Sequence, residues 1–376
     1  MTLVLLMAVF TECNHKTSVD YGQLDTIQVK AEKVLEVDSV SLNHLVYPQI
    51  LERDGKTLVT SINVVDNSVK IYNLATGQLD RTYLFAKEGP NKVGAVLSVS
   101  FPNSDAIFYL DQSSTLYVLD DSLKFLSRHS FKQAEQKGLP LFYANHIPLI
   151  HKSGDKLVAV NYYTNRTDRM LLLEVDLSTD SLRYFNPIPP EVVEGYYGMA
   201  DFTYWNYVYN PNSKSYAFSF PASDSLYMYD ADLNFTHKVS ARSTLKTDEV
   251  APPLPTVKSD DLGELRKFSQ EEVMSRIKQS WAYHDLIYNP KKGHYYRFVG
   301  LPISEMDIED GDPIRSEVRQ FTLLVMNEDF ETLNEYLLPY NKYLIEKDCF
   351  FIHSGDLYLQ RHEEDEDRIY LDVLDL

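Results

Sequence analysis

Cysteine is scarce in this sequence of 376 residues, which contains only two. Two cysteines exclude a disulfide-stapled scaffold and a zinc centre of the four-cysteine kind. Basic residues are also few, because 36 Lys and Arg stand against 55 Asp and Glu and leave a formal charge of −19. A chain this acidic is a poor partner for nucleic acid or an anionic membrane surface. No apolar run approaches the roughly 18 residues of a membrane-spanning helix.

Known catalytic signatures are missing as well. The sequence has no Gly-x-Ser-x-Gly elbow, no His-Glu-x-x-His, no phosphate-binding loop and no dinucleotide fingerprint. His146 and His151 have an odd spacing that places them on opposite faces of a strand. The acidic stretch Asp307–Asp312 has its glycine out of register for an EF-hand, so we expect a solvated loop rather than a calcium site. We predict no catalytic residue, metal or cofactor, and an enzyme is the less favoured interpretation.

The N-terminus holds the most hydrophobic stretch, Leu3–Phe10, followed closely by Cys13. An apolar core that ends at a cysteine resembles a lipoprotein signal, in which the thiol receives a diacylglycerol. Two features depart from that pattern: no Lys or Arg precedes the run, and Glu12 occupies a position that favours small residues. A buried first strand is the alternative. We predict a signal over residues 1–13, a tether over residues 14–23 and an exported, cell-envelope protein that contacts the membrane only through its lipid.

The second cysteine lies in an apolar setting. Cys349 is followed by Phe350, Phe351 and Ile352. A thiol in such surroundings is typically an inert part of the core.

Short turn signals recur along the whole chain, each between two strand-like runs. They consist of Gly, Asn, Asp, Ser and Pro, the residues that tight turns require. Corresponding positions are separated by roughly 50 to 80 residues, about the size of one propeller blade or more. The six signals are Arg53–Lys56, Pro102–Asp105, Lys152–Asp155, Asn210–Ser213, Asn289–Gly293 and His353–Asp356.

A second series of apolar strands runs in phase with these turns. Two hairpins per unit make four strands, named A to D, and six units predict a six-bladed, all-β propeller of antiparallel blades. Ser114–Phe125 and Ser223–Phe235 are the strongest internal match. The strands of the second series are Val69–Leu74, Leu116–Asp120, Leu171–Asp176, Leu226–Asp230, Phe321–Met326 and Ile369–Leu374.

The sixth unit supplies only three strands. We expect Ile27–Val37 to provide the fourth and to close the ring, so that residues 24–376 form one domain. A two-domain chain is the alternative, because Pro252–Pro255 resembles a linker and a helix with Ser269 as its N-cap is expected over Phe268–Trp281. Both series resume afterwards in phase, and we therefore predict a helical insertion over about 244–280, between blades four and five.

With the blades assigned, the chain resembles the six-bladed propeller lipoproteins of Bacteroidetes, a family of unknown function. The resemblance covers nearly the whole chain after Cys13. Its most specific features are the loop Glu88–Gly94 after the first blade and Tyr295–Arg297 in strand B of blade five. The resemblance implies a propeller fold and an exported location, and it implies no activity.

One face of the predicted propeller carries all the long connections, which join strand D to the next strand A or strand B to strand C. Function tends to lie on elaborated loops held by a rigid scaffold. We therefore expect the ligand on this face. The long connections are Lys87–Gly94, Lys132–Asn145, Pro187–Thr203, Arg242–Ser280, Leu301–Ser316 and Glu363–Asp367.

Aromatic residues mark the candidate binding positions on that face. Tyr196 and Tyr197, flanked by glycines, and nearby Trp205 are suited to stacking on a sugar or a peptide. In the alternative, alternate residues of this strand, Tyr204, Tyr207 and Tyr209, fill the core.

A second group of candidates lies in blade five and after blade one. Trp281, Tyr283 and His284 begin another inner strand, where a lone histidine is more often structural than a ligand. Arg297 is suited to an anionic ligand group, although pairing with a carboxylate is favoured. The set is completed by Asn91 and Lys92 in the Glu88–Gly94 loop.

These observations favour an exported binding module for an unknown glycan, peptide or envelope protein. One alternative is an envelope glycan lyase or hydrolase, which would require two or three ionisable groups with shifted pKa values at the channel mouth. The other is a structural subunit that docks a partner through residues 244–280, which would require an apolar patch over the insertion.

Overall fold

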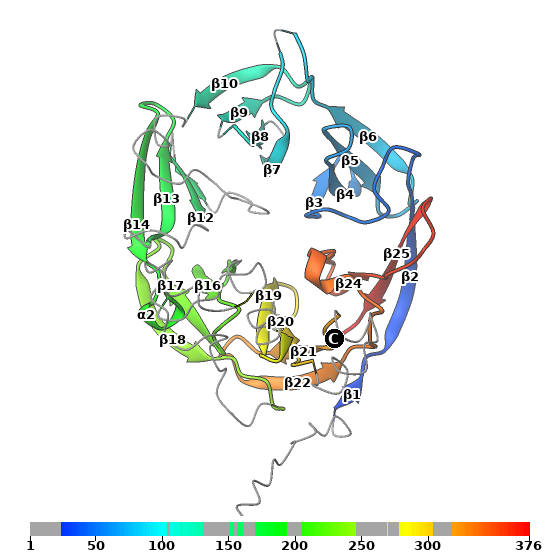
Figure 1. Cartoon of the computed structure of the whole chain (residues 1–376), viewed down its shortest axis with the longest axis vertical. Helices are drawn as coiled ribbons and strands as arrows, with labels where there is room; N and C mark the ends of the chain where they lie inside the picture. The colour runs from blue at the N-terminus through cyan, green and yellow to red at the C-terminus, as the bar shows by residue number, and fades with distance from the viewer. Residues whose placement is uncertain are drawn as a thin grey trace, which may run out of the picture.

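The structure, a computed structural model, describes residues 24–89, 91–103, 106–113, 115–130, 151–153, 156–160, 170–193, 205–245, 269, 278–303 and 318–376. Its strands form six sheets arranged in a ring (Figure 1). Five blades are consecutive antiparallel sheets, and the sixth joins three C-terminal strands to one from the N-terminus. The predicted six-bladed β-propeller is confirmed.

Each blade runs from an inner strand A to an outer strand D, and the turns fall where the sequence predicts them. The A and B strands are β3 (Ile50–Arg53), β4 (Lys56–Asn63), β7 (Val96–Asn103), β8 (Ala106–Asp111), β11 (His151–Ser153), β12 (Lys156–Val160), β15 (Asn206–Asn210), β16 (Ser215–Ser219), β19 (Ala282–Asn289), β20 (His294–Gly300), β23 (Phe350–His353) and β24 (Asp356–Gln360).

The C and D strands complete the blades, and the second series of the sequence corresponds to strand C throughout. These strands are β5 (Ser68–Asn73), β6 (Leu79–Leu84), β9 (Thr115–Leu119), β10 (Phe125–Ser130), β13 (Met170–Asp176), β14 (Ser181–Pro187), β17 (Ser225–Tyr229), β18 (Phe235–Ser240), β21 (Phe321–Met326), β22 (Thr332–Leu337), β25 (Arg368–Leu374) and β2 (Val29–Glu36). The remaining elements are β1 (Asp25–Thr26), helix α2 (Pro190–Val193) and the 3-10 helix η2 (Ile345–Lys347).

The turns between strands C and D share one local mechanism. In blade 4 the carboxylate of Asp230 accepts the backbone N–H groups of Asp232 and Asn234, both at 2.9 Å. The same bonds recur at Asp120 in blade 2 and at Asn327 in blade 5. A side-chain oxygen that satisfies the N–H groups of its own turn is the reason Asp and Asn recur there.

Burial follows the position of a strand within its blade. Strands β9, β17 and β21 are buried along their whole lengths, whereas β18 is exposed at most positions. The middle strands are covered on both faces because each blade packs against two neighbours, and the apolar clusters lie at the seams between blades. This explains the near-continuous apolar runs in the sequence.

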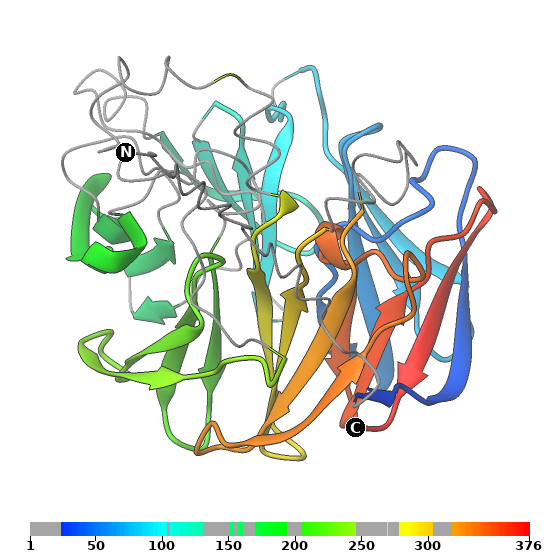
Figure 2. The same ribbon diagram turned by 60° about the horizontal axis from the view of Figure 1, so that its bottom comes forward.

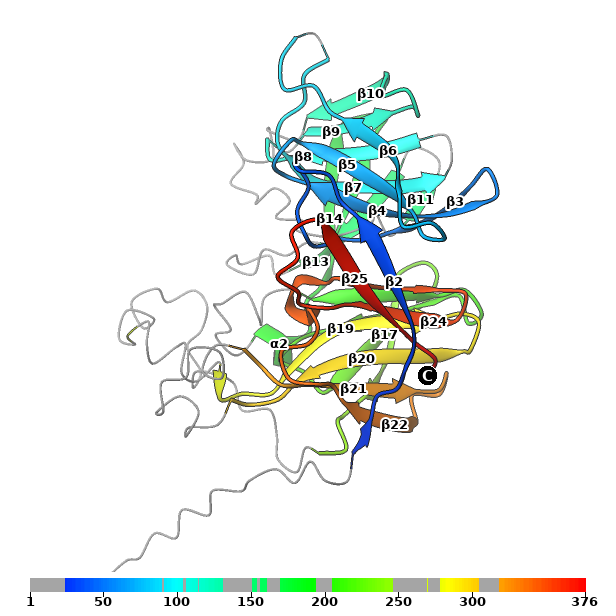
Figure 3. The same cartoon turned by 90° about the vertical axis from the view of Figure 1, so that its right-hand side faces the viewer.

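The ring closes as predicted. Strand β2 pairs antiparallel with β25, with Val29 opposite Leu374 and Leu35 opposite Ile369. Just before it, β1 pairs parallel with β22, the outer strand of blade 5. The N-terminal segment therefore joins blades 5 and 6 before it completes blade 6 (Figure 3).

The A–B and C–D turns lie on one face of the ring, and the other connections lie on the opposite face, which we call the loop face (Figure 2). Its described residues are 37–49, 64–67, 85–89, 91–95, 112–113, 188–193, 205, 220–224, 241–245, 269, 278–281, 301–303, 318–320, 338–349 and 361–367. Most of the predicted insertion 244–280, including nearly all of its expected helix, lies outside the described residues. The strands on either side of it belong to the same ring. Its start is fastened to blade 5, because buried Glu335 accepts bonds from the Ser243 hydroxyl and the Thr244 N–H, each at 2.7 Å.

Ring closure can be tested on two residues of β2. Leu35 is fully buried, whereas Val29 is 43% exposed. We expect Leu35→Ala to lower the free energy of unfolding by about 2–5 kcal/mol, because it opens a cavity in the closing seam. Val29→Ala, the matched control, should change it by less than about 0.5 kcal/mol. Urea unfolding measures both, and an effect of Leu35→Ala as small as that of Val29→Ala would show that the packing of β2 does not stabilise the ring.

Candidate functional site

Strand β20 places the residues Tyr295–Arg297 in the seams of blade 5. Its side chains alternate between the two seams of blade 5. Tyr295 packs toward blade 4, where its hydroxyl accepts a bond from the Asn210 amide at 2.9 Å. Tyr296 packs toward blade 6, and its hydroxyl accepts a bond from the Asn289 amide at 3.1 Å. Asn289 also donates to the Gly355 carbonyl of blade 6 at 2.8 Å, so these residues join three blades.

Arg297 is fully buried between blades 4 and 5, which corrects its prediction as a ligand-binding residue. Its guanidinium donates to the Ser219 hydroxyl and to the carbonyls of Ala241 and Ser223 at 2.8–3.2 Å. It also lies 4.2 Å from the ring centroid of Tyr283. Among the described residues its hydrogen-bond acceptors include a hydroxyl and carbonyls, and the negative charge of Asp224 also favours the charged guanidinium. Burial lowers the pKa of Arg297 to about 10, and the side chain stays charged at neutral pH.

Some of the aromatic candidates lie in the core, and the others lie outside the residues that the structure describes. Trp205 and Tyr283 are 2% and 0% exposed, and Trp281 packs against the cluster that contains Tyr283. Trp205 and Tyr283 are therefore not stacking surfaces, and this part of the prediction is corrected. The alternative, in which alternate tyrosines of this strand fill the core, is confirmed for Tyr207, which packs into the core. It is wrong for Tyr209, which is 43% exposed.

Other predicted positions are undescribed or lie elsewhere on the ring. Tyr196, Tyr197, Tyr204, Cys13 and the acidic stretch 307–312 lie outside the described residues.

Asn91 and Lys92 are exposed, between blades 1 and 2. The base of their loop is fixed at Gly94, whose N–H donates to Asp111 at 3.0 Å and whose carbonyl accepts the Asn67 amide at 3.3 Å. A Cβ at Gly94 would lie 2.6 Å from the Asp111 carboxylate, which explains the glycine.

The last predicted position, Cys349, is confirmed as a core thiol. It is 1% exposed, and its thiol donates to the Leu45 carbonyl at 2.9 Å. Burial raises the pKa of this thiol well above its usual range, so the reactive thiolate is disfavoured.

A pair of carboxyl groups that the sequence analysis did not select lies between blades 5 and 6. Asp285 on β19 and Asp348 just before β23 form a side-chain hydrogen bond, and Asn206 of blade 4 bonds to Asp285 as well. The side-chain amide oxygen of Asn206 also accepts the N–H of Leu286 at 2.9 Å. Residues on or next to the inner strands of three successive blades therefore form one cluster near the loop face.

The environment of this pair favours one retained proton. Burial raises the pKa of both groups, and the charge and hydrogen bond of Asp285 raise that of Asp348 further. Two carboxyl groups in contact cannot both ionise easily, so the pair titrates as a unit.

A bulge in β19 places His284 and Asp285 side by side. The register with β20 shifts between Tyr283 and Leu286, so His284 and Asp285 face one partner residue. The His284 ring contacts Phe321 edge-on at 5.0 Å, and its Nε2 has no hydrogen-bond partner among the described residues. Burial, helped by the Arg319 charge, lowers the pKa of His284 to about 3 and keeps the ring neutral.

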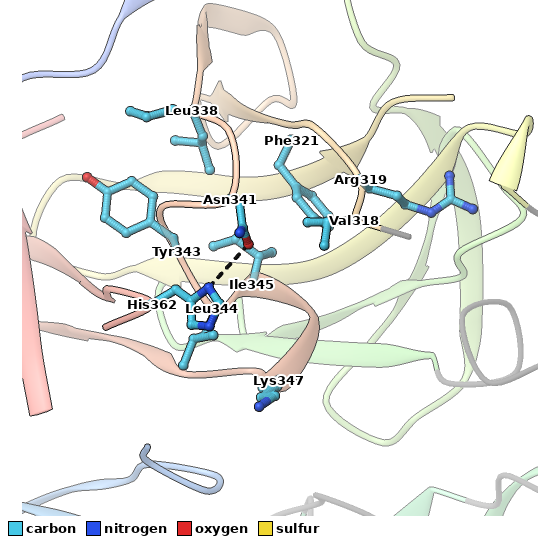
Figure 4. A pocket seen from close by; sticks show the side chains of 11 residues that line it. Val318, Arg319, Phe321, Leu338, Asn341, Tyr343, Leu344, Ile345, Lys347 and His362 are labelled. Carbon is cyan, nitrogen blue, oxygen red and sulfur yellow. Dashed lines mark hydrogen bonds between the residues drawn. The ribbon is translucent and has the colours of Figure 1, made fainter. Parts of the chain in front are cut away.

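Close by, the loop face contains a cavity of about 190 Å³ between blades 5 and 6 (Figure 4). It lies beside strand β21, under the connection from β22 to β23 that includes η2. Its apolar lining consists of Val318, Phe321, Leu338, Pro339, Tyr343, Leu344 and Ile345, and its polar lining of Arg319, Asn341, Lys347 and His362. The connection 338–349 was not among the long segments selected from the sequence, and no motif in it indicated a pocket.

Within the described residues, no three His, Cys, Asp or Glu side chains are grouped so as to hold a metal ion. No described helix is long and apolar enough to cross a membrane.

The fold and this geometry can now be compared with known proteins. Residues 26–337 match the family described as "Domain of unknown function (DUF4221)". The chain belongs to the DUF4221 family. A crystal structure of a DUF4221 member from Bacteroides vulgatus is similar, with a TM-score of 0.70 and 17% identity over 93% of this chain and 97% of that one. No curated protein matches the chain.

A second solved structure shares the fold. It is a Bacteroides fragilis protein named as a candidate exported protein, with a TM-score of 0.56 and 10% identity over 94% of this chain and 98% of that one. At these identities the two structures establish the propeller fold.

The carboxyl pair predicts a pH-dependent effect of Asp348→Asn. A carboxyl whose pKa is raised by folding contributes stability that is full below its unfolded pKa near 3.8 and is lost as pH rises through the folded pKa. The variant cannot ionise, so its stability relative to the native chain should rise as the pH increases above about 4, by about 1.4 kcal/mol for each unit of pKa shift. Urea unfolding across this range measures the difference.

The matched control is Asp232→Asn, at an exposed residue in a turn of blade 4. It should show no such trend. A loss of stability in Asp348→Asn that is equal at every pH would contradict the shared proton.

Proposed function

We propose that this DUF4221 chain is an exported binding module that holds its ligand on the loop face, in the cavity between blades 5 and 6. The observation that carries the proposal is the cavity itself, which combines an apolar interior with polar groups at its edge. Binding sites for small molecules and side chains commonly have this composition. The two blades that form the cavity are held together by β1 and β2, so its walls are well supported.

An apolar ligand group fits the cavity better than a sugar. The Tyr343 hydroxyl donates to Asp372 at 2.8 Å, and the Arg319 guanidinium donates to the Ser280 and Leu301 carbonyls. These polar atoms are already engaged, and only the apolar parts of the two side chains remain for a ligand. A sugar needs many hydrogen bonds to replace its water, whereas an apolar side chain of a peptide needs none. Of the predicted partners, a peptide or protein is therefore favoured over a glycan.

Export through a lipid anchor at Cys13 is part of the same proposal. It rests on the apolar stretch Leu3–Phe10 before that cysteine, and the Bacteroides fragilis neighbour, named as a candidate exported protein, supports the location.

An envelope enzyme is the second candidate, and Asp285 with Asp348 is the observation that favours it. Paired carboxyl groups with raised pKa values are typical of acid–base sites. Such an enzyme should turn over a peptide or glycan substrate, and Asp348→Asn should abolish turnover without abolishing binding. We rank it below the binding module because the two carboxyl groups are already bonded to each other and Asp285 is bonded to Asn206 as well.

Filling the cavity tests the binding function. Val318 lines the cavity, whereas Val65 is a loop-face residue of blade 1 that is 58% exposed. We expect Val318→Trp to weaken binding of peptides selected from a random library at least about tenfold, because the ring occupies the space of the ligand. Val65→Trp, the matched control, should leave binding unchanged, as measured by calorimetry.

Alanine at Tyr196 and Tyr197 tests the competing position that the sequence predicts. Loss of binding in these variants, with full binding in Val318→Trp, would place the site on the two tyrosines and contradict the proposal that the ligand binds in the cavity.

The lipid anchor is tested separately. Labelled palmitate should be incorporated by the native chain in a Bacteroidetes host and should be absent from Cys13→Ala, because the thiol is the acceptor. Cys349→Ala is the control and should keep the label. Label that persists in Cys13→Ala would rule out this anchor.

A further inference from the structure

The edge of the cavity presents hydrogen-bond donors. The His362 ring lies 3.3 Å from the Asn341 side-chain oxygen, and with Nδ1 protonated it donates to that oxygen. This bond leaves the Asn341 amide N–H groups for another acceptor. The His362 backbone N–H donates to the Lys342 carbonyl at 2.7 Å and fixes the residue beside the opening.

A cation lies at the same edge. Lys347, the last residue of η2, is exposed, and its ammonium group has no ion-pair partner within the described part of the chain. Figure 4 shows this side chain at the border of the cavity, directed outward. A flexible lysine in this position can reach a group that projects from the opening.

Among the residues that the structure describes, the lining contains no carboxylate, although the chain carries 55 of them. Glu363, which follows the lining residue His362 in the sequence, forms an ion pair with Arg361 at 2.9 Å. Asp348, next to Lys347, shares a proton with Asp285. The pair therefore carries less negative charge than two free carboxylates would. The charges that line the opening therefore complement an anion.

The interior sets the size of the apolar part. A cavity of roughly 150 Å³ lined by apolar side chains holds one benzene ring in another protein. The cavity here is about 190 Å³, which is sufficient for one aromatic ring or a branched aliphatic group.

We infer that the cavity binds an organic carboxylate, with one ring or branched chain in the interior and the carboxylate held at the edge by Asn341 and Lys347. This inference rests on the proposed binding function and names its ligand class. A free acid and the acidic end of a peptide share this chemistry. The competing class is a basic ligand attracted by the exposed acidic loop 363–367, which borders His362.

Three probes of equal size separate the classes: phenylacetate, its neutral amide phenylacetamide, and the basic phenethylamine. Calorimetry or saturation-transfer NMR on the full chain should give the highest affinity for phenylacetate. Lys347→Gln should lower the affinity for phenylacetate roughly two- to fivefold, the usual range for an exposed ion pair, and leave the affinity for phenylacetamide unchanged. Lys124→Gln, at an exposed residue in a turn of blade 2, is the matched control and should change neither. Val318→Trp should abolish binding of both.

The outcomes distinguish the ligand class from the binding function. Equal affinities for phenylacetate and phenylacetamide, both lost in Val318→Trp, would contradict the proposal that the ligand is a carboxylate but would retain the cavity as a binding site. Tighter binding of phenethylamine than of phenylacetate would contradict the carboxylate ligand and indicate a basic one. Binding that survives Val318→Trp, or no binding of any probe, would overturn the cavity as the site. A comparison of phenylacetate with an acetyl-capped dipeptide ending in phenylalanine then separates a free acid from a peptide terminus.

Discussion

The antiparallel pairing of β2 with β25 is the constraint on which the rest of the structure depends. A ring of sheets has no stable partial form, because each blade covers its apolar faces only when both neighbours are present. The pairing joins the two ends of the chain, from Val29 opposite Leu374 to Glu36 opposite Arg368. It also determines where the N-terminal segment runs. Ile27 packs into the apolar cluster that contains Leu338 and Tyr343, so closure of the ring and support of the cavity use the same residues.

The seams combine apolar packing with a few fixed polar contacts. Burial of Tyr and Leu side chains supplies most of the stability, but apolar faces alone allow neighbouring blades to slide. Arg297 and Asn289 prevent this by bonding to carbonyls of the adjacent blades. A buried charge is costly unless its donors are satisfied. Arg297 meets that requirement with a serine hydroxyl and carbonyls, and this arrangement suits a seam better than it suits a ligand site.

The repeat could be predicted from sequence because each turn is determined locally. Asp230 bonds to N–H groups two and four residues ahead of it, and this requirement leaves a recognisable pattern. The site could not be predicted in this way. Asp285 and Asp348 meet only because blades 5 and 6 are neighbours, and the bulge that aligns Asp285 has no sequence signature. Trp205 and Tyr283 were selected as stacking residues because glycines or strand starts flank them, yet both faces of a blade are covered and these rings fill the seams.

The connection from β22 to β23 brings the remaining features together. Asp348 ends η2 in a left-handed conformation, with φ of 53°, and its N–H donates to the Ile345 carbonyl at 3.0 Å. A left-handed aspartate and a shared proton both lower stability, and such costs persist mainly where the surrounding structure enforces them or a function requires them. Ile345 and Lys347 line the cavity from this short helix. The segment that carries a left-handed residue and one member of the buried carboxyl pair therefore also forms a wall of the cavity, and these costs and the binding surface coincide at one place on the loop face.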